Sequence, residues 1–184
     1  SCETEEEINN LWEKLSEGGN IMMEFQQYPF SEKYGWLNDK YGVSWQLSLT
    51  KTGQKINPSL MFVGDKAGKA EEAMKFYASL FPDSEIGETA RYEKGEPDKE
   101  GYIKYALFKL KGLEFSVMDS SGPHAFSFNE AVSLYVDCAD QVEVDDLWNK
   151  LTADGGEESM CGWLKDKYGV SWQIIPKQLG DFMT

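Results

Sequence analysis

Apolar residues recur with helical spacing in three segments of the chain. The positions, three or four apart, are Ile8, Leu11, Trp12 and Leu15, then Ala70, Ala73, Met74, Tyr77 and Phe81, then Val144, Leu147, Trp148 and Leu151. Each set covers one face of a helix, so the pattern predicts three amphipathic helices. Thr4 and Glu7 are spaced as a capping box ahead of the first helix, and Pro82 ends the second.

Short apolar runs between these helices predict β-strands. They cover residues 59–63, 85–92, 102–110, 113–119 and 133–136. Lys111-Gly112 joins two of them in a tight turn, and the charged run 93–100 is expected to form a solvated hairpin loop. The order strand, helix and three strands (βαβββ) therefore occurs twice in the later part of the chain. The first helix has no strand ahead of it.

An internal repeat relates the beginning of the chain to its end. Residues 35–46 (GWLNDKYGVSWQ) return as residues 162–173 (GWLKDKYGVSWQ), identical at eleven of twelve positions. This offset is 127, whereas residues 11–15 match residues 147–151 at an offset of 136. The later copy is therefore nine residues shorter (136 - 127 = 9), and the piece it lacks corresponds roughly to residues 23–33, a strand and turn.

Composition narrows the class of protein. Hydrophobic residues make up 41% of 184, and no apolar run reaches the roughly 18 residues of a membrane span. The net charge of -14, without a basic stripe, argues against nucleic-acid binding. The three cysteines lack CxxC spacing, so we expect no disulfide scaffold or zinc ribbon, and a reducing, cytoplasmic compartment.

Several motifs together resemble a known family. They are residues 60–62 (LMF), 70–77 (AEEAMKFY), 80–84 (LFPDS), 155–156 (GG) and 161–176 (CGWLKDKYGVSWQIIP). The chain is similar to the PhnB-like branch of the glyoxalase/bleomycin resistance/dioxygenase (vicinal oxygen chelate) superfamily, which is also labelled 3-demethylubiquinone-9 3-methyltransferase. The resemblance implies an α+β fold in which paired βαβββ units form curved mixed sheets around a pocket.

The resemblance also implies a domain organisation. Residues 1–50 are expected to be the second half of a βαβββ-type domain without its opening strand, and residues 51–57 a linker. Residues 58–176 would form a complete domain of two βαβββ units, and residues 177–184 a tail. An odd number of units leaves a sheet unpaired, so we expect a homo-oligomer such as a dimer, a swap, or association with the missing half domain.

Enzymes of this superfamily hold a metal ion on strand residues of both units. The matching first-strand positions in this chain are Pro58 and Ala131, which supply no ligand, and the last-strand position is Gln173, a weak one. With His124 as the single histidine, we expect no catalytic metal. The alternative is a divalent-metal-dependent isomerase, lyase or dioxygenase that recruits Gln173, His124 and Glu114, with His124 and Glu114 as the candidate catalytic residues.

Aromatic residues are abundant enough to line an apolar pocket. The expected pocket residues are Gln173, its repeat counterpart Gln46, Trp172, Trp163, Phe62 and Cys161. Packing in the core explains the aromatic residues equally well, and the two glutamines could be structural. The leading hypothesis is a protein that binds a small apolar or aromatic molecule without a metal.

The methyltransferase label supplies a further alternative. An S-adenosylmethionine site requires a glycine-rich turn that opens a helix after a strand, and we expect no such turn here. Clustered basic residues for a phosphonate are also missing, because Arg91 is the single arginine. We therefore expect no cofactor.

Overall fold

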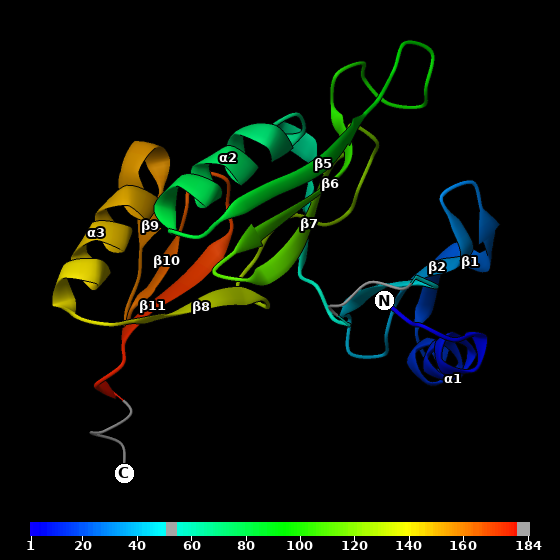
Figure 1. Ribbon diagram of the computed structural model, residues 1–184, viewed down its shortest axis with the longest axis horizontal. Coiled ribbons are helices and arrows are strands. Elements are labelled where there is room, and N and C mark those ends of the chain that lie inside the picture. Colours follow the sequence, from blue (N-terminus) through cyan, green and yellow to red (C-terminus); the bar gives the residue numbers. More distant parts are fainter. Residues whose placement is uncertain (51–54, 180–184) are drawn as a thin grey trace. The chain divides into compact units, whose positions relative to one another are not determined.

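The computed structural model describes residues 1–50 and 55–179. The chain divides into two compact units, Ser1–Asn57 (unit 1) and Pro58–Thr184 (unit 2). In Figure 1 unit 1 is blue to cyan, and unit 2 continues through green to red. The expected linker 51–57 and tail 177–184 lie partly outside the described residues.

Unit 1 consists of one helix on a three-stranded antiparallel sheet. Its elements are α1 (Glu5–Ser16), β1 (Asn20–Tyr28), β2 (Ser31–Asn38) and β3 (Ser44–Ser48), with the strand order β1-β2-β3. Thr4 accepts a hydrogen bond from the Glu7 amide, as the capping box predicts, although Glu7 in turn accepts from the amide of Glu3. The strand and turn predicted at roughly residues 23–33 lie within the hairpin of β1 and β2.

The first half of unit 2 is a βαβββ module. It contains β4 (Ser59–Phe62), α2 (Ala70–Leu80), β5 (Glu85–Arg91), β6 (Ile103–Leu110) and β7 (Leu113–Asp119), and a short 3-10 helix at Gly64–Lys66. The sheet order is β4-β7-β6-β5, with β4 parallel to β7 and the other pairs antiparallel. One face of this sheet packs against α2 because Ala106, Phe108, Phe115 and Val117 alternate toward it.

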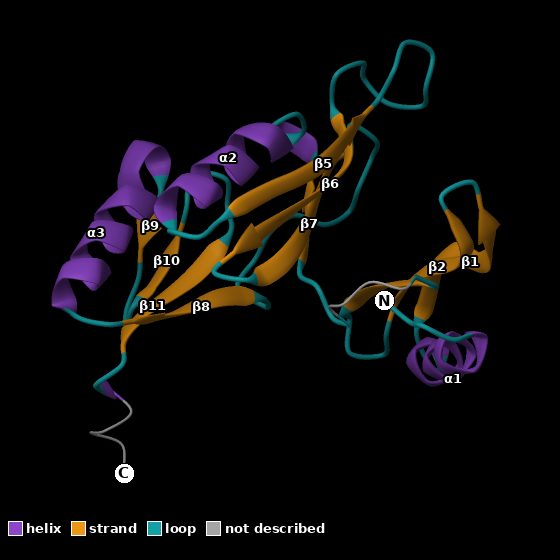
Figure 2. Cartoon of the chain, viewed as in Figure 1, coloured by secondary structure: helices purple, strands orange, loops and turns teal. Residues whose placement is uncertain are grey.

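The second half of unit 2 repeats this plan. Its elements are β8 (Ser133–Cys138), α3 (Gln141–Thr152), a 3-10 helix at Ala153–Gly155, β9 (Glu157–Glu158), β10 (Trp163–Lys165) and β11 (Ser171–Pro176). The order is β8-β11-β10-β9, again with the first strand parallel to the last. The mixed α+β class and the paired βαβββ modules predicted from the sequence are confirmed (Figure 2).

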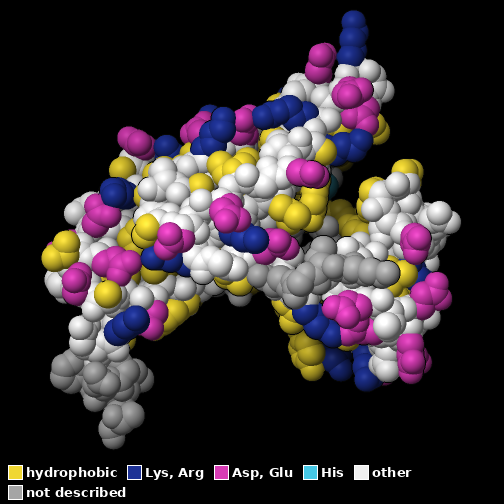
Figure 3. Space-filling model, in the orientation of Figure 1, with side chains coloured by type: hydrophobic (Ala, Val, Ile, Leu, Met, Phe, Trp, Pro, Cys, Tyr) yellow, Lys and Arg dark blue, Asp and Glu magenta, His cyan; other side chains and the backbone are white. Residues whose placement is uncertain are grey.

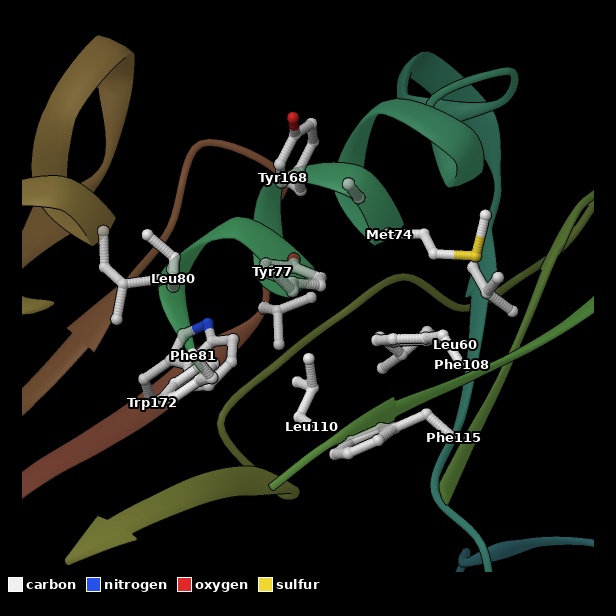
Figure 4. Close-up of a cluster of buried hydrophobic side chains, with 14 of the residues drawn as sticks. Leu60, Met74, Tyr77, Leu80, Phe81, Phe108, Leu110, Phe115, Tyr168 and Trp172 are labelled. Carbon is white, nitrogen blue, oxygen red and sulfur yellow. The ribbon is translucent and has the colours of Figure 1, made fainter. Parts of the chain in front are cut away.

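One hydrophobic core holds the two modules of unit 2 together. Tyr77 and Phe81 at the end of α2 pack on Trp172 of β11, with ring centroids 5.3 and 6.1 Å apart, respectively (Figure 4). The Tyr77 hydroxyl donates to Asp166 at 2.7 Å, and so does the Trp172 indole at 2.9 Å. Asp166 therefore joins α2 to the second module through buried hydrogen bonds.

The first residues of unit 1 pair with the end of its sheet. No strand precedes α1 in residues 1–50, but Cys2 forms an isolated parallel bridge with Leu49. Cys138 at the end of β8 pairs with Pro176 in the same way, and both pairs are related by the repeat offsets. Cys2 thus has the pairing in unit 1 that Cys138 has at the end of β8 in unit 2. No helix within the described ranges is both long and apolar enough to cross a bilayer.

Candidate functional site

The face of the second sheet away from α3 carries polar side chains in rows across the strands. Because neighbouring residues in a strand point to opposite faces, Trp172 faces the core, and Ser171 and Gln173 face the other way; we call this second face the open face. Strand pairing places Ser133, Ser171 and Lys165 in one row. Tyr135, Gln173 and Trp163 form the next row.

The open face contains a hollow of about 200 Å³, which we call the Ser171 hollow. It is lined by Glu130, Glu157, Glu158, Ser159, Trp163, Leu164, Lys165 and Ser171. Ser171 is only 2% exposed, and its hydroxyl has no hydrogen-bond partner among the described residues. A buried hydroxyl without a partner costs free energy, roughly 1–3 kcal/mol, so this atom is suited to a ligand or an ordered water.

The repeat supplies an internal comparison for this hollow. In unit 1 the Trp36 indole donates to the Ser44 hydroxyl at 2.7 Å. Trp163 and Ser171 are the equivalent pair in unit 2, and no hydrogen bond joins them in the part of the chain that the structure describes. The same two side chains are therefore hydrogen-bonded to each other in unit 1, whereas in unit 2 they are not and both line the hollow.

Lys165 provides the positive charge of the Ser171 hollow. Its ammonium group lies 3.0 Å from a carboxylate oxygen of Glu130 and 3.8 Å from one of Glu157. The hydrogen bond from Lys165 lowers the pKa of Glu130, and the same bond raises the pKa of Lys165. A row of opposite charges thus borders the buried Ser171 hydroxyl.

The structure places the expected pocket residues in different environments. Phe62 and Trp172 lie in the hydrophobic core, where they pack against Phe128 and Tyr77, respectively, whereas Trp163 lines the Ser171 hollow. Cys161 is exposed in the turn before β10, with a φ of +57°. Of the aromatic residues in the expected set, Trp163 alone borders the hollow.

The two repeated glutamines make different hydrogen bonds. Gln173 donates from its amide nitrogen to the Ser133 hydroxyl at 2.7 Å, across the β11–β8 ladder. Gln46 in unit 1 accepts from the Tyr34 hydroxyl at 3.0 Å. Gln173 stands beside Trp163 on the open face, so it is placed next to the hollow.

The two candidate catalytic residues lie on separate segments of unit 2. His124 is in the loop after β7, and its Nε2 atom is 2.8 Å from the Ser120 hydroxyl. Glu114 is on β7, opposite Lys109 in the β6–β7 ladder. No group of three or more His, Cys, Asp or Glu side chains suited to a metal ion occurs in residues 1–50 and 55–179. The residues present do not fit the metal site of the superfamily.

The turn ahead of α2 does not form a cradle for a methyl-donor cofactor. A turn with two glycines, Gly64 and Gly68, joins β4 to α2. The amides of Gly68 and Ala70 donate to the carboxylate of Asp119, at 2.7 and 3.1 Å. Burial raises the pKa of Asp119. Because this side chain occupies the amides at the start of α2, they do not serve an anionic or nucleotide-like ligand.

Sequence reasoning missed Lys165 and Ser171. Position 165 is the one that differs between the two copies of the twelve-residue repeat, being Asn38 in unit 1. That difference is visible in the sequence, and the residue that differs lines the hollow. The isolation of the Ser171 hydroxyl was not visible, because Ser44 has the same neighbours in the sequence.

Comparisons with known proteins agree with the fold. A family model described as 3-demethylubiquinone-9 3-methyltransferase matches residues 1–48 and 54–175. A solved PhnB protein from Bacillus cereus, described in the same words, is 45% identical with a TM-score of 0.59, and the match covers 67% of this chain and 99% of that chain. A search of curated proteins returns no match.

More distant solved structures share the fold alone. Protein PA1353 from Pseudomonas aeruginosa is 18% identical with a TM-score of 0.55, over 68% of this chain and 98% of that chain. A glyoxalase I mutant from Zea mays is 14% identical with a TM-score of 0.56, over 91% of this chain and 62% of the maize chain. The chain belongs to the family described as 3-demethylubiquinone-9 3-methyltransferase, the PhnB-like branch of the glyoxalase/bleomycin resistance superfamily.

Proposed function

We propose that the protein binds a small molecule in the Ser171 hollow, on the open face of the second sheet. The observation that carries the proposal is the buried Ser171 hydroxyl, which has no partner among the described residues. The proposal involves no metal ion, because the glutamates that line the hollow are not among any described group of side chains arranged to hold one. The protein acts here as a binding module.

The lining of the hollow defines the chemistry of the ligand. Trp163 offers the flat surface of an indole and an indole N–H, which suit a small aromatic molecule. Ser171 and Lys165 lie side by side in one row, and both can donate a hydrogen bond to a neutral carbonyl oxygen of the ligand. We therefore propose a mostly apolar, aromatic ligand that carries one oxygen atom able to accept hydrogen bonds.

The experiment uses NMR of protein labelled with 15N, since each tryptophan indole N–H gives its own signal. Benzoate, benzamide and indole are titrated, three probes that share a ring and differ in the acceptor oxygen. Benzamide is expected to shift the Trp163 signal more than indole does, and more than benzoate, whose negative charge is opposed by the three glutamates of the lining. Ser171→Ala should weaken binding about fivefold, corresponding to roughly 1 kcal/mol for one hydrogen bond.

The matched control is Ser44→Ala, which changes the equivalent serine in unit 1. It should leave probe binding at Trp163 unchanged while shifting the Trp36 signal, because Ser44 accepts from the Trp36 indole. Binding that is unaffected by Ser171→Ala, or probes that leave the Trp163 signal in place, would contradict the proposal.

A further inference from the structure

The two copies of the repeat differ in charge at the place of the Ser171 hollow. In unit 1, Asn20 of β1 pairs with Asn38 of β2. The repeat puts Lys165 at the position of Asn38, and the strand partner of Lys165 on β9 is Glu157. Two neutral amides in unit 1 therefore correspond to two charged side chains in unit 2. The charges are specific to the copy that contains the hollow.

Alternation along the strands decides which charged side chains share the open face. Glu157 and Lys165 lie in the same row as Ser171. Glu158 is the next residue on β9 and is directed toward α3, where the Trp148 indole donates to its carboxylate at 3.1 Å. Glu157 is therefore the carboxylate of β9 that stands on the open face, beside Lys165.

The charges around Lys165 do not balance. Lys165 is the one cation among the residues that line the hollow, and its ammonium group lies 3.0 Å from Glu130 and 3.8 Å from Glu157. The shorter contact is with Glu130, so the negative charge of Glu157 is the less compensated of the two. The Glu157 side chain is also the most accessible of the three, at 74%. An accessible carboxylate in excess of the available cations attracts a positively charged group.

The buried Ser171 hydroxyl indicates independently that the hollow receives a ligand. Exposed charges alone do not indicate one, because most charged side chains lie at the surface. In this row, however, the charges lead to a side chain that is 2% exposed and whose hydroxyl has no partner among the described residues. Trp163 lines the same hollow and offers an aromatic surface. The charged row, the hydroxyl and the indole thus belong to one site.

We infer that the ligand of the Ser171 hollow carries a positively charged group, and that Glu157 is the residue that selects it. The inference rests on the proposed function, because it names the charge of the molecule that this hollow binds. The carbonyl oxygen of the ligand accepts from Ser171 and Lys165, and its ammonium group lies at Glu157. The ligand class is therefore an organic cation built on an aromatic ring.

The dimensions of the site restrict this ligand further. Lys165 stands between Ser171 and Glu157 in the row, so those two residues are two strand spacings apart, about 9–10 Å. A carbonyl oxygen and an ammonium group at opposite ends of one ring fit this separation. The hollow of about 200 Å³ is also smaller than the roughly 300–1,000 Å³ of sites for drug-sized molecules. A ligand with a single ring and para substitution follows.

The test compares three benzamides that differ at the para position. One carries a positively charged aminomethyl group, one a neutral hydroxymethyl group of nearly the same size, and one a carboxylate. Each is titrated into the 15N-labelled chain, and the Trp163 indole signal gives the dissociation constant. The ammonium probe should bind about two- to fivefold more tightly than the hydroxymethyl probe at low salt, as one exposed ion pair allows, and the carboxylate probe should bind most weakly. Added salt should reduce this preference.

Two variants that install the residues of unit 1 should act in opposite directions. Glu157→Asn should remove the preference for the ammonium probe. Lys165→Asn should increase that preference, because two carboxylates then lack a cation, while the hydroxymethyl probe binds more weakly since its carbonyl loses a donor. Damage to the fold would weaken all probes and would not separate the variants in this way. The matched control is Glu88→Asn on β5, which changes the net charge equally outside the hollow and should keep the preference.

The outcomes separate the inference from the proposed function. Equal affinities for the ammonium and hydroxymethyl probes would overturn the inference and leave the proposed function standing. Probes that leave the Trp163 signal unchanged would overturn both. A preference that persists in Glu157→Asn, or that is equally large at the Trp36 indole of unit 1, would arise from the net charge of -14 rather than from Glu157, and would also overturn the inference.

Discussion

The two aspartates of the repeat show how environment changes one kind of residue. Burial is the largest influence on Asp166 and raises its pKa, although four hydrogen bonds act in the opposite direction. The pKa of Asp39 is lowered, chiefly by the hydrogen bond from the Trp45 indole. The seven residues that follow each aspartate are identical, so we attribute the difference in pKa to α2, which covers Asp166.

Asp166→Asn is expected to destabilise unit 2 by about 2–3 kcal/mol, because an amide group turns N–H donors toward the Trp172 indole and the Tyr77 hydroxyl. Asp39→Asn should cost unit 1 about 1 kcal/mol or less, since water reaches its partners. Urea unfolding followed by circular dichroism and hydrogen exchange measures both values. Equal losses for the two variants would contradict the role given to burial.

The alternating pattern of a strand predicts which residues share a face of the sheet. Trp172 and Gln173 are neighbours in a strand, so one of them had to face the core and the other the open face. The sequence alone did not show which, because an aromatic residue suits a core and a pocket equally. The contact of Trp172 with Phe81 of α2 decides it, and that contact depends on tertiary packing.

Helices and long strands follow the sequence pattern closely. Helix α2 was expected from the apolar positions ending at Phe81, and the structure ends it at Leu80 with Phe81 as the next residue. Strand β9 had no such signal, since Glu157–Glu158 has no apolar alternation and is defined by its pairing with β10. Short strands are set by their neighbours, so a local pattern does not reveal them.

An ion pair links α2 to β5 and has a pH dependence. Arg91 on β5 lies 2.8 Å from a carboxylate oxygen of Glu71 on α2, and Lys75 lies 2.7 Å from the same oxygen. The hydrogen bond from Arg91 is the main reason that the pKa of Glu71 is lowered to about 2. A lowered carboxylate pKa adds stability that is present above the ordinary pKa and is lost as the pH falls toward 2.

Glu71→Gln should therefore lower the free energy of unfolding of unit 2 at pH 7, by no more than about 1 kcal/mol because the pair is partly exposed. The difference in free energy of unfolding between Glu71→Gln and the unaltered protein should shrink as the pH falls from 5 to 2. Denaturant unfolding at a series of pH values measures it. Lys75→Gln keeps the Arg91 contact and should retain most of the pH dependence; a difference that grows in acid would refute this assignment.

At the scale of the whole molecule, the described residues form two hydrophobic cores of unequal size. The core of unit 1 has three buried residues, Cys2, Ile8 and Leu47, against twenty-two in the core of unit 2. Figure 3 shows acidic and basic side chains interspersed over the visible face, as the composition suggests. Since each unit buries its own apolar surface, each has its own stability.

Unit 1 is expected to unfold before unit 2, at a lower urea concentration, because it buries far less apolar side-chain surface. Hydrogen exchange with mass spectrometry on the intact chain follows peptides from both units. Ile8→Ala should lower the free energy of unfolding of unit 1 by about 2–4 kcal/mol and leave that of unit 2 unchanged. A single transition shared by all peptides would show that the two units fold as one.

The near-identity of residues 35–46 and 162–173 has a consequence for biogenesis. Tyr77 of α2 contacts Asp166 and Trp172 in the folded protein. The earlier copy of the repeat has an aspartate and a tryptophan at the same positions, so during folding α2 can pack against either copy. Connectivity biases the choice toward the later copy, because α2 and residues 162–173 belong to the same compact unit. Multidomain chains with similar neighbours are prone to such kinetic partitioning, so refolding from denaturant should give a fraction trapped in a misassembled topology in which the earlier copy holds α2.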